Sequence, residues 1–142
     1  MISEWDMRFL RLAQHVSTWS KYPRTKVGAV IADGKNIVSL GFNGFPPGIQ
    51  DDHRLDDREL ALKIVTHAEV NAILTARRDV SGYTLYTWPF SPCNSCASIV
   101  IKSGIKKVVT LKSDNELWGS SFQLARKLFK ESGVDFYEVD NV

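Results

Sequence analysis

The sequence predicts an α/β protein in which a mixed five-stranded sheet is sandwiched between helices. Short apolar runs with the length of strands alternate with longer segments of helical periodicity along the chain. Asp33-Gly34 is a favoured hairpin turn, so the first two strands should be antiparallel. A helix joins the last two strands and should make them parallel neighbours. The 142 residues contain no repeat or linker and fit one domain, 1–142.

The sequence of the N-terminal third predicts one helix, a β-hairpin and a loop. Ser3 can cap a helix whose apolar residues recur at steps of three or four, namely Trp5, Phe9, Leu12, Val16 and Trp19. Val27–Ala32 and Ile37–Phe42 read as the paired strands. The segment Gly41–Gly48 then holds three glycines and two prolines. It is either a plain rigid loop or one whose backbone approaches a ligand closely, with Asn43 offering a donor and an acceptor.

The remaining elements follow in alternation. Residues 50–60 are rich in charges of both signs, which is typical of a solvated face. Apolar residues resume at Leu60 and lead to a helix that ends near Arg77. The strands expected after it are Thr84–Thr87, Lys107–Leu111 and Val134–Val139. Between the first two we expect a helix that runs from Cys93, stops at Gly104 and buries Ile99, Val100 and Ile101. Between the last two we expect a helix at Ser120–Ser132 that packs through Phe122, Ala125, Leu128 and Phe129.

Two short motifs contain the residue types that bind zinc. Thr66-His67-Ala68-Glu69 supplies a histidine and a carboxylate two residues apart, and Ser91-Pro92-Cys93-Asn94-Ser95-Cys96 contains both cysteines of the chain. A histidine and two thiolates fill three positions of a tetrahedral site and leave the fourth for water, as in catalytic zinc sites. We therefore expect one zinc ion at His67, Cys93 and Cys96, with Glu69 as the base.

Each motif alone also has a structural interpretation. Thr66 and Glu69 have the spacing of a capping box, and Ser91-Pro92 suits an N-cap followed by a first helical residue. A lone C-x-x-C also occurs in redox pairs and structural zinc sites. Together the motifs favour a catalytic site, because a structural site would need a fourth Cys or His. Two helix N-termini should then converge on the metal and favour the thiolates.

Charge and hydropathy narrow the class of protein. The 18 basic and 16 acidic residues leave a net charge of +2, which argues against binding nucleic acid by bulk attraction. No apolar run approaches the roughly 18 residues of a membrane span. The N-terminus, with Glu4 and Asp6, does not resemble a signal peptide. Two cysteines at metal-ligand spacing fit a reducing compartment, so we expect a cytoplasmic protein.

The combination H-x-E and P-C-x-x-C matches the known signature of nucleobase deaminases, and the chain resembles the zinc-dependent cytidine deaminase superfamily. The zinc motif identifies only the superfamily. The sequences GFNGFPPG at 41–48 and HAEVNAI at 67–73 point to the deoxycytidylate (dCMP) deaminases within it. Further segments that carry the resemblance are Ser20-Lys21, Lys26–Val30, Ser91–Cys96, Ser103–Ile105 and Ser132–Val134.

The resemblance implies a three-layer cytidine-deaminase-like fold and hydrolysis of dCMP to dUMP and ammonia, feeding thymidylate synthesis. It implies that His67, Cys93 and Cys96 bind zinc, that Glu69 shuttles protons, and that Asn43, Ala68 and Pro92 contact the substrate. Phe42 stands where many relatives have tyrosine, and Arg24 stands where some have asparagine. Spacing alone does not decide which of Arg24, Lys26, Arg54 and Lys112 meets the substrate phosphate.

The resemblance also implies a homo-hexamer activated by dCTP and inhibited by dTTP with Mg²⁺. The candidate effector residues are Lys26, Gly41, Phe42, Asn43, Gly44, Asn71 and Arg78. Arg77 and Arg78 could equally well stabilise the C-terminus of a helix, where the helix dipole is negative.

Two other functions remain open. One is deamination of nucleic acid, as by a tRNA adenosine deaminase, which needs a basic surface along a backbone. The C-terminal Asp135–Asp140 is instead acidic. The other is a non-enzymatic zinc-binding module, which would have a closed metal site.

Overall fold

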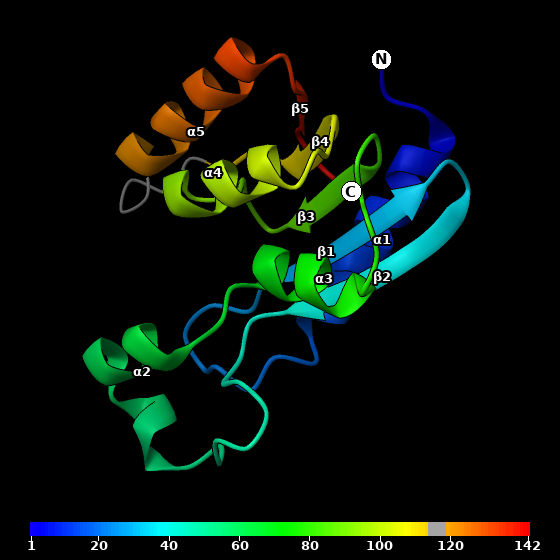
Figure 1. Cartoon of the computed structure of the whole chain (residues 1–142). Helices are drawn as coiled ribbons and strands as arrows, with labels where there is room; N and C mark the ends of the chain where they lie inside the picture. Colours follow the sequence, from blue (N-terminus) through cyan, green and yellow to red (C-terminus); the bar gives the residue numbers. More distant parts are fainter. Residues whose placement is uncertain (114–118) are drawn as a thin grey trace.

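The computed structural model describes residues 1–113 and 119–142, and within them it confirms the mixed five-stranded sheet (Figure 1). The strand order is β2-β1-β3-β4-β5. The strands are β1 Gly28–Asp33, β2 Asn36–Phe42, β3 Thr84–Trp88, β4 Lys107–Leu111 and β5 Asp135–Val139. β1 is antiparallel to β2 and β4 is parallel to β5, as the hairpin and the connecting helix predicted. The structure adds that β1 is antiparallel to β3 and that β3 is parallel to β4.

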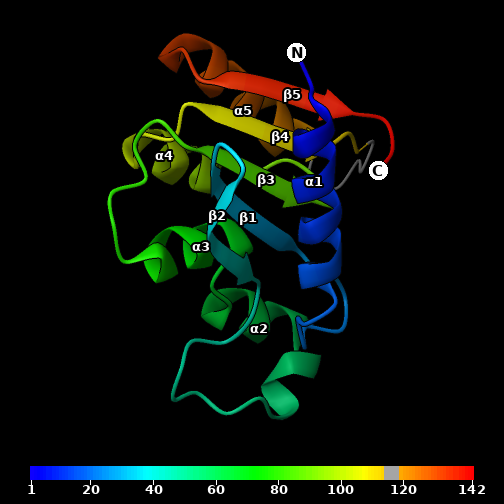
Figure 2. The ribbon, with the colours of Figure 1, turned by 90° about the vertical axis from the view of Figure 1, so that its right-hand side faces the viewer.

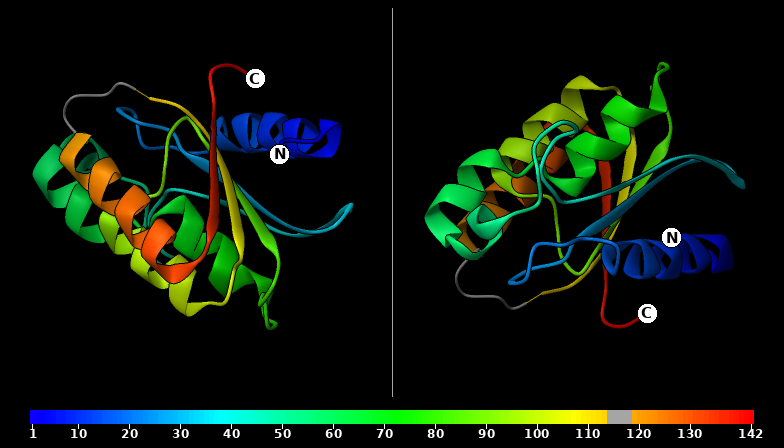
Figure 3. Two further views of the ribbon diagram at one scale, coloured as in Figure 1. Left: turned by 90° about the horizontal axis from the view of Figure 1, so that it is seen from above. Right: turned by 90° about the horizontal axis from the view of Figure 1, so that it is seen from below.

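Helices cover both faces of the sheet (Figure 3). One face carries α1, Glu4–Ser17, and the other carries α3, Ala68–Ala76, α4, Asn94–Lys102, and α5, Gly119–Ser132. Strand β1 shows the alternation that this requires, since Ala29 and Ile31 pack under α3 and α4 while Val30 packs under α1. The sheet is therefore the middle layer of three.

Helix α1 begins where the sequence predicted. The Ser3 hydroxyl accepts a hydrogen bond from Asp6 N at 3.1 Å, and the Asp6 carboxylate accepts one from Ser3 N at 2.8 Å, which completes a capping box. Phe9 and Val16 are buried as expected. Trp5 and Trp19, predicted in the same stripe, are 36% and 45% exposed, because the contact face is narrower than the apolar stripe.

The direction of the strands explains why two distant motifs meet. β2 and β3 are both antiparallel to the β1 strand between them, so they run in the same direction. The chain leaves both strands at the same edge of the sheet. After β3 it enters α4, and after β2 it passes through η1 and α2 before a bridge between Gly44 and Thr66 returns it to the end of β2, where α3 starts. The two helices consequently start at this edge, on the same face.

The structure corrects several local expectations. Residues 50–60 were expected only as a solvated face, but they contain η1, a 3-10 helix at His53–Asp56, and the start of α2, Arg58–Ile64, which project beyond the sheet (Figure 2). Ile99 was expected in the core and is 42% exposed; α4 instead buries Cys96, Ala97 and Val100. Strand pairing extends to Asp33 and Asn36, which moves the hairpin turn to Gly34-Lys35.

None of the helices in the described part of the chain is long and apolar enough to span a membrane.

Candidate active site

The two zinc motifs form the first turns of α3 and α4. His67 is the N-cap residue of α3 and Cys93 is that of α4, and neither side chain makes a capping hydrogen bond. The capping roles considered for Thr66 and Ser91 are therefore wrong. Thr66 instead forms a bridge with the Gly44 backbone, and the Ser91 hydroxyl donates to Pro92 O. The cap positions leave the imidazole and the thiol free to point away from their helices.

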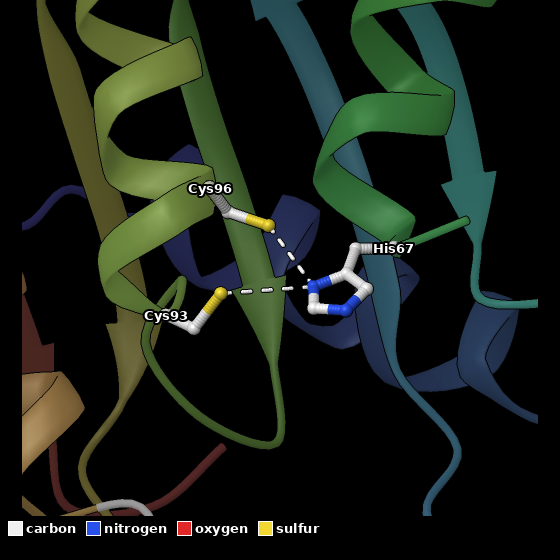
Figure 4. Close-up of side chains that lie close together, drawn as sticks. All are labelled: His67, Cys93 and Cys96. Atoms are coloured by element: carbon white, nitrogen blue, oxygen red, sulfur yellow. Dashed lines mark hydrogen bonds between the residues drawn. The ribbon is translucent and has the colours of Figure 1, made fainter. Parts of the chain in front are cut away.

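His67, Cys93 and Cys96 point toward one another (Figure 4). His67 Nδ1 lies 3.0 Å from Cys96 Sγ and 3.7 Å from Cys93 Sγ, and the three ligand atoms lie within 4.8 Å of one another. A tetrahedral zinc ion with Zn–N near 2.0 Å and Zn–S near 2.3 Å keeps such atoms roughly 3.5–3.8 Å apart. The donor set fits zinc. The 3.7 Å to Cys93 Sγ lies in this range, whereas the 3.0 Å to Cys96 Sγ is shorter, so His67 Nδ1 and Cys96 Sγ would have to move apart to hold the ion.

Hydrogen bonds among these side chains shift the pKa values of both thiols. The pKa of the Cys93 thiol is lowered to about 3, first by a hydrogen bond from Cys96 and then by one from His67. The pKa of Cys96 is raised because its thiol hydrogen-bonds to Cys93 and because it is buried. Cys96 thus keeps its proton and donates it in a hydrogen bond to the Cys93 thiolate. A metal ion would replace that proton, since cysteine binds zinc as thiolate.

Glu69 lies beside this cluster in the first turn of α3. Its side chain is 4% exposed. Burial raises the pKa of its carboxyl to about 7, against the lowering effect of nearby His67. A carboxyl group in that range can both accept and release a proton near neutral pH.

A cavity of about 260 Å³ opens onto the cluster. Its wall is formed by Tyr22, Arg24, Thr25, Val27, Asn43, Arg58, Leu62, Val65, His67, Ala68, Glu69, Phe90, Ser91, Cys93 and Phe122. Asn43 and Ala68, two of the predicted substrate contacts, are in this wall. Pro92, the third, is not among the described lining residues, although its neighbours Ser91 and Cys93 are.

Asn43 is buried and held by the backbone of the preceding turn. Its Oδ1 accepts from Val27 N at 2.9 Å, and its Nδ2 donates to Thr25 O at 2.8 Å. The Ser20 hydroxyl donates to Asn43 O at 2.8 Å. Asn43 therefore fixes the segment 20–27, which supplies four lining residues of the cavity.

The predicted effector residues, apart from Asn43, do not line the cavity within the described chain. A Cβ at Gly41 would lie 2.4 Å from Ala68 O, so this glycine allows β2 and α3 to pack closely. Asn71 Nδ2 donates to Phe42 O at 2.7 Å. The Lys26 amino group donates to Ser20 O, and the Arg78 guanidinium donates to the Tyr83 hydroxyl.

Sequence reasoning missed several lining residues. Arg58 lies within the charged run 50–60, where nothing distinguishes it from its neighbours. Phe90 and Phe122, with ring centroids 5.2 Å apart, come from the cysteine loop and from α5 and meet only in the folded chain. Apolar periodicity identified Phe122 as a core residue but could not place it beside the site.

Comparison with known proteins agrees with this site. The family model of the cytidine and deoxycytidylate deaminase zinc-binding region matches residues 3–112. The chain is 42% identical over 138 residues to an uncharacterized deaminase of Aliivibrio fischeri, covering 95% of this chain and 93% of that protein. It is 40% identical over 141 residues to the deoxycytidylate deaminase of Mus musculus, covering 94% and 78%.

A solved structure confirms the predicted three-layer fold. The dCMP deaminase of cyanophage S-TIM5, in complex with dCMP and dUMP, superposes with a TM-score of 0.81 at 25% identity, covering 98% of this chain and 99% of that one. The matched region includes both zinc motifs and the helices that carry them. The chain belongs to the cytidine and deoxycytidylate deaminase family.

Proposed function

We propose that this protein hydrolyses dCMP to dUMP and ammonia with one zinc ion per chain. The observation that carries the proposal is the position of buried Glu69 beside His67, Cys93 and Cys96 at the wall of one cavity. The substrate is supported by the mouse relative, a deoxycytidylate deaminase, and by the phage enzyme solved with dCMP and dUMP.

His67, Cys93 and Cys96 would hold the metal through one nitrogen and two sulfur atoms. A zinc ion in such a site lowers the pKa of a bound water from about 16 toward about 7, which supplies a nucleophile at neutral pH. The helix N-termini at His67 and Cys93 place partial positive charge near the thiolates and stabilise them.

Glu69 moves the protons of the reaction. Its carboxylate accepts a proton from the attacking water and delivers it to N3 of cytosine, so that C4 becomes electrophilic and the water oxygen bonds to it. Glu69 then takes the second water proton and passes it to the exocyclic amino group. The C4–N bond breaks, ammonia leaves with the bonding pair, and the C4 carbonyl of uracil remains. A pKa near 7 suits Glu69 to both directions of transfer.

The cavity wall supplies the contacts that orient the nucleotide. Asn43 Nδ2 donates one of its two hydrogens to Thr25 O, and the second can donate a hydrogen bond to the deoxynucleotide. Ala68 lies next to Glu69 in the wall. We assign Pro92 an indirect role, because it sets the path of the chain between the lining residues Ser91 and Cys93.

The decisive experiment is ammonia release by the purified, zinc-loaded protein. The substrates are cytosine, deoxycytidine, dCMP, dCTP, a single-stranded oligonucleotide and a tRNA. We expect dCMP to react fastest. Faster reaction of the oligonucleotide or the tRNA would favour the nucleic-acid deaminase instead, and no reaction with any substrate would favour a zinc-binding module.

We propose further that the working form is a cytoplasmic homo-hexamer, activated by dCTP and inhibited by dTTP with Mg²⁺, whose dUMP supplies thymidylate synthesis. The support is the resemblance at 41–48 and 67–73 together with the need of the thiolate ligands for a reducing compartment. Control requires dCTP and dTTP to prefer different states of the protein.

The regulation is tested by the dependence of rate on dCMP concentration. We expect a sigmoidal curve that dCTP makes hyperbolic and dTTP suppresses. Arg78→Glu should weaken both responses if this side chain binds an effector. A hyperbolic curve that neither nucleotide alters would refute the regulatory proposal.

A further inference from the structure

Two arginines from separate segments lie in the cavity wall. Arg24 belongs to the turn before β1, and Arg58 is the first residue of α2. Arg24 Nη2 donates to Asp56 O at 3.3 Å, and Asp56 is only two residues before Arg58. This hydrogen bond brings the segment of Arg24 against the start of α2, and both arginines line the same cavity.

The arginines mark the open side of the cavity. Both are exposed residues, whereas Glu69 is 4% exposed. A cytosine ring that reaches Glu69 therefore occupies the deep part of the cavity, and the remainder of the ligand extends toward the arginines. A phosphate group is best placed there, because it remains partly hydrated and avoids the free-energy cost of full burial.

The charges of these arginines are not neutralised within the described chain. Across residues 1–113 and 119–142, Arg58 has no ion pair and no side-chain hydrogen bond, and Arg24 bonds only to the Asp56 carbonyl. Acidic neighbours exist on the same segment, namely Asp56, Asp57 and Glu59. They are not among the described lining residues, and Asp57 accepts from Leu60 N at 3.2 Å to cap α2.

The other cationic candidates either have partners already or do not line the cavity within the described chain. Arg54 makes two bonds to the Asp52 carboxylate, Nε–Oδ1 at 2.8 Å and Nη2–Oδ2 at 3.0 Å. The Lys26 amino group donates to Ser20 O. Lys112, beyond the end of β4, is not among the described residues that line the cavity.

We propose that Arg58 and Arg24 together bind the 5′-phosphate of the substrate and thereby select a nucleoside monophosphate over the free nucleoside. This inference rests on the proposed function and adds its specificity-determining residues. A guanidinium group presents a planar fork of N–H donors that matches two phosphate oxygens. Two such forks and one dianionic phosphate balance in charge, whereas a neutral 5′-hydroxyl would leave both arginines without a counter-ion.

The test is the selectivity ratio, kcat/KM for dCMP divided by kcat/KM for deoxycytidine. We expect Arg58→Gln and Arg24→Gln each to lower this ratio by about tenfold to hundredfold, the size of a lost charge-assisted hydrogen bond. Arg58→Lys should recover only part of the loss, because an ammonium group lacks the fork. Lys63→Gln is the matched control. It removes one positive charge from the same helix at an exposed residue outside the cavity wall, and its ratio should stay that of the wild type.

A binding measurement separates this inference from the proposed reaction. Calorimetry with the zinc-loaded protein should show tighter binding of dUMP than of deoxyuridine, and Arg58→Gln should remove most of that difference. The inference is overturned if the Arg24→Gln, Arg58→Gln double variant keeps the wild-type preference, or if Lys63→Gln loses as much. Failure of the wild type to deaminate any cytosine compound would refute the proposed function alone, since the dUMP comparison would still decide the role of the arginines.

Discussion

The sheet separates two buried carboxyl groups whose pKa values shift in opposite directions. On the α1 face, Asp6 accepts hydrogen bonds from the Tyr86 hydroxyl at 2.6 Å and from the Lys107 amino group at 2.9 Å. Burial alone would raise the pKa of Asp6, but the bonds from Ser3 N, Tyr86 and Lys107 outweigh it and hold the pKa below 3.8. On the other face, burial dominates and raises the pKa of Glu69 to about 7.

The difference distinguishes a stabilising cluster from a reactive one. Asp6 has donors for its charge, so the folded state favours its ionised form. Glu69 lies instead among groups that compete for protons, with the pKa of Cys93 lowered and that of Cys96 raised. Perturbed ionisation of this kind, next to a cavity, is characteristic of functional sites. Mutations of Glu69 and of its thiol neighbours should therefore affect activity, whereas mutations of Asp6 should affect stability.

The largest effect is expected from Cys96→Ser. A hydroxyl is a much weaker zinc ligand than a thiolate, so bound zinc should fall from one ion per chain toward none and deamination should fall to background. Metal analysis of the dialysed protein and an ammonia assay measure the two effects. Ser95→Ala, at the exposed neighbouring residue, is the control and should retain both. Retention of stoichiometric zinc by Cys96→Ser would contradict the ligand assignment.

Glu69→Gln should separate metal binding from catalysis. The amide has nearly the shape of the carboxylate but cannot accept and return the proton, so kcat should fall by about 10²–10⁴-fold. The zinc content should remain that of the wild type. Glu59→Gln, an exposed carboxylate on α2, should keep full activity. A near-normal rate in Glu69→Gln would show that another group transfers the proton.

Asp6→Asn should reverse the pattern by destabilising the fold while the zinc site remains intact. Loss of the charge leaves partly buried Lys107 without its counter-ion, and we expect the free energy of unfolding to fall by about 2–3 kcal/mol. Urea denaturation measures this change. Glu4→Gln, at an exposed residue in the same helical turn, should alter stability by less than about 0.5 kcal/mol.

The pH dependence of the Asp6 effect follows from its lowered pKa. The contribution of Asp6 is fully present above the pKa of the unfolded chain, near 3.8, and is lost as the pH falls through the lower folded value. The stability difference between wild type and Asp6→Asn should thus be constant from pH 7 to about pH 5 and shrink below pH 4. A difference that grew in acid would contradict this account.

Gly41→Ala tests how α3 is positioned against β2. A methyl group at Gly41 would lie 2.4 Å from Ala68 O and 2.5 Å from Ala72 N, so α3 must shift away from β2. We expect Gly41→Ala to destabilise the fold by about 1–3 kcal/mol and to weaken zinc binding, since α3 carries His67. Gly44→Ala is the matched control, because a methyl group there meets no atom within 4 Å. Equal behaviour of the two variants would show that the close packing is unimportant.

Strands and metal ligands were predictable because their signals are local. Lys107–Leu111 was predicted with its observed bounds, since a compact apolar run between turn residues has few other interpretations. His67, Cys93 and Cys96 were predicted to come together because the ligand types and spacing of zinc are restrictive. In both cases a short stretch of sequence determines the chemistry of the feature.

Features that depend on the folded chain were not predictable. Helix α2 was missed because the charged residues before Leu60 show no apolar periodicity, and the helix projects beyond the sheet with only Ala61 buried. Ile99 was assigned to the core because a short helix with several apolar residues does not reveal which side faces the sheet. Arg58 is one of many charged residues in its segment, and it is distinguished only by its position in the cavity wall of the folded chain.

The common direction of β2 and β3 also determines where the protein can be modified for practical use. The connections at 34–35, 77–83, 103–106 and 133–134 all lie at the edge of the sheet opposite the zinc motifs, because each one leads into the start of β2, β3, β4 or β5. Fluorescent labels, affinity peptides or surface-immobilisation tags inserted at Gly34-Lys35 would therefore sit a full strand length away from the cavity. That edge is the natural attachment side for a sensor that reports deoxynucleotides through this site.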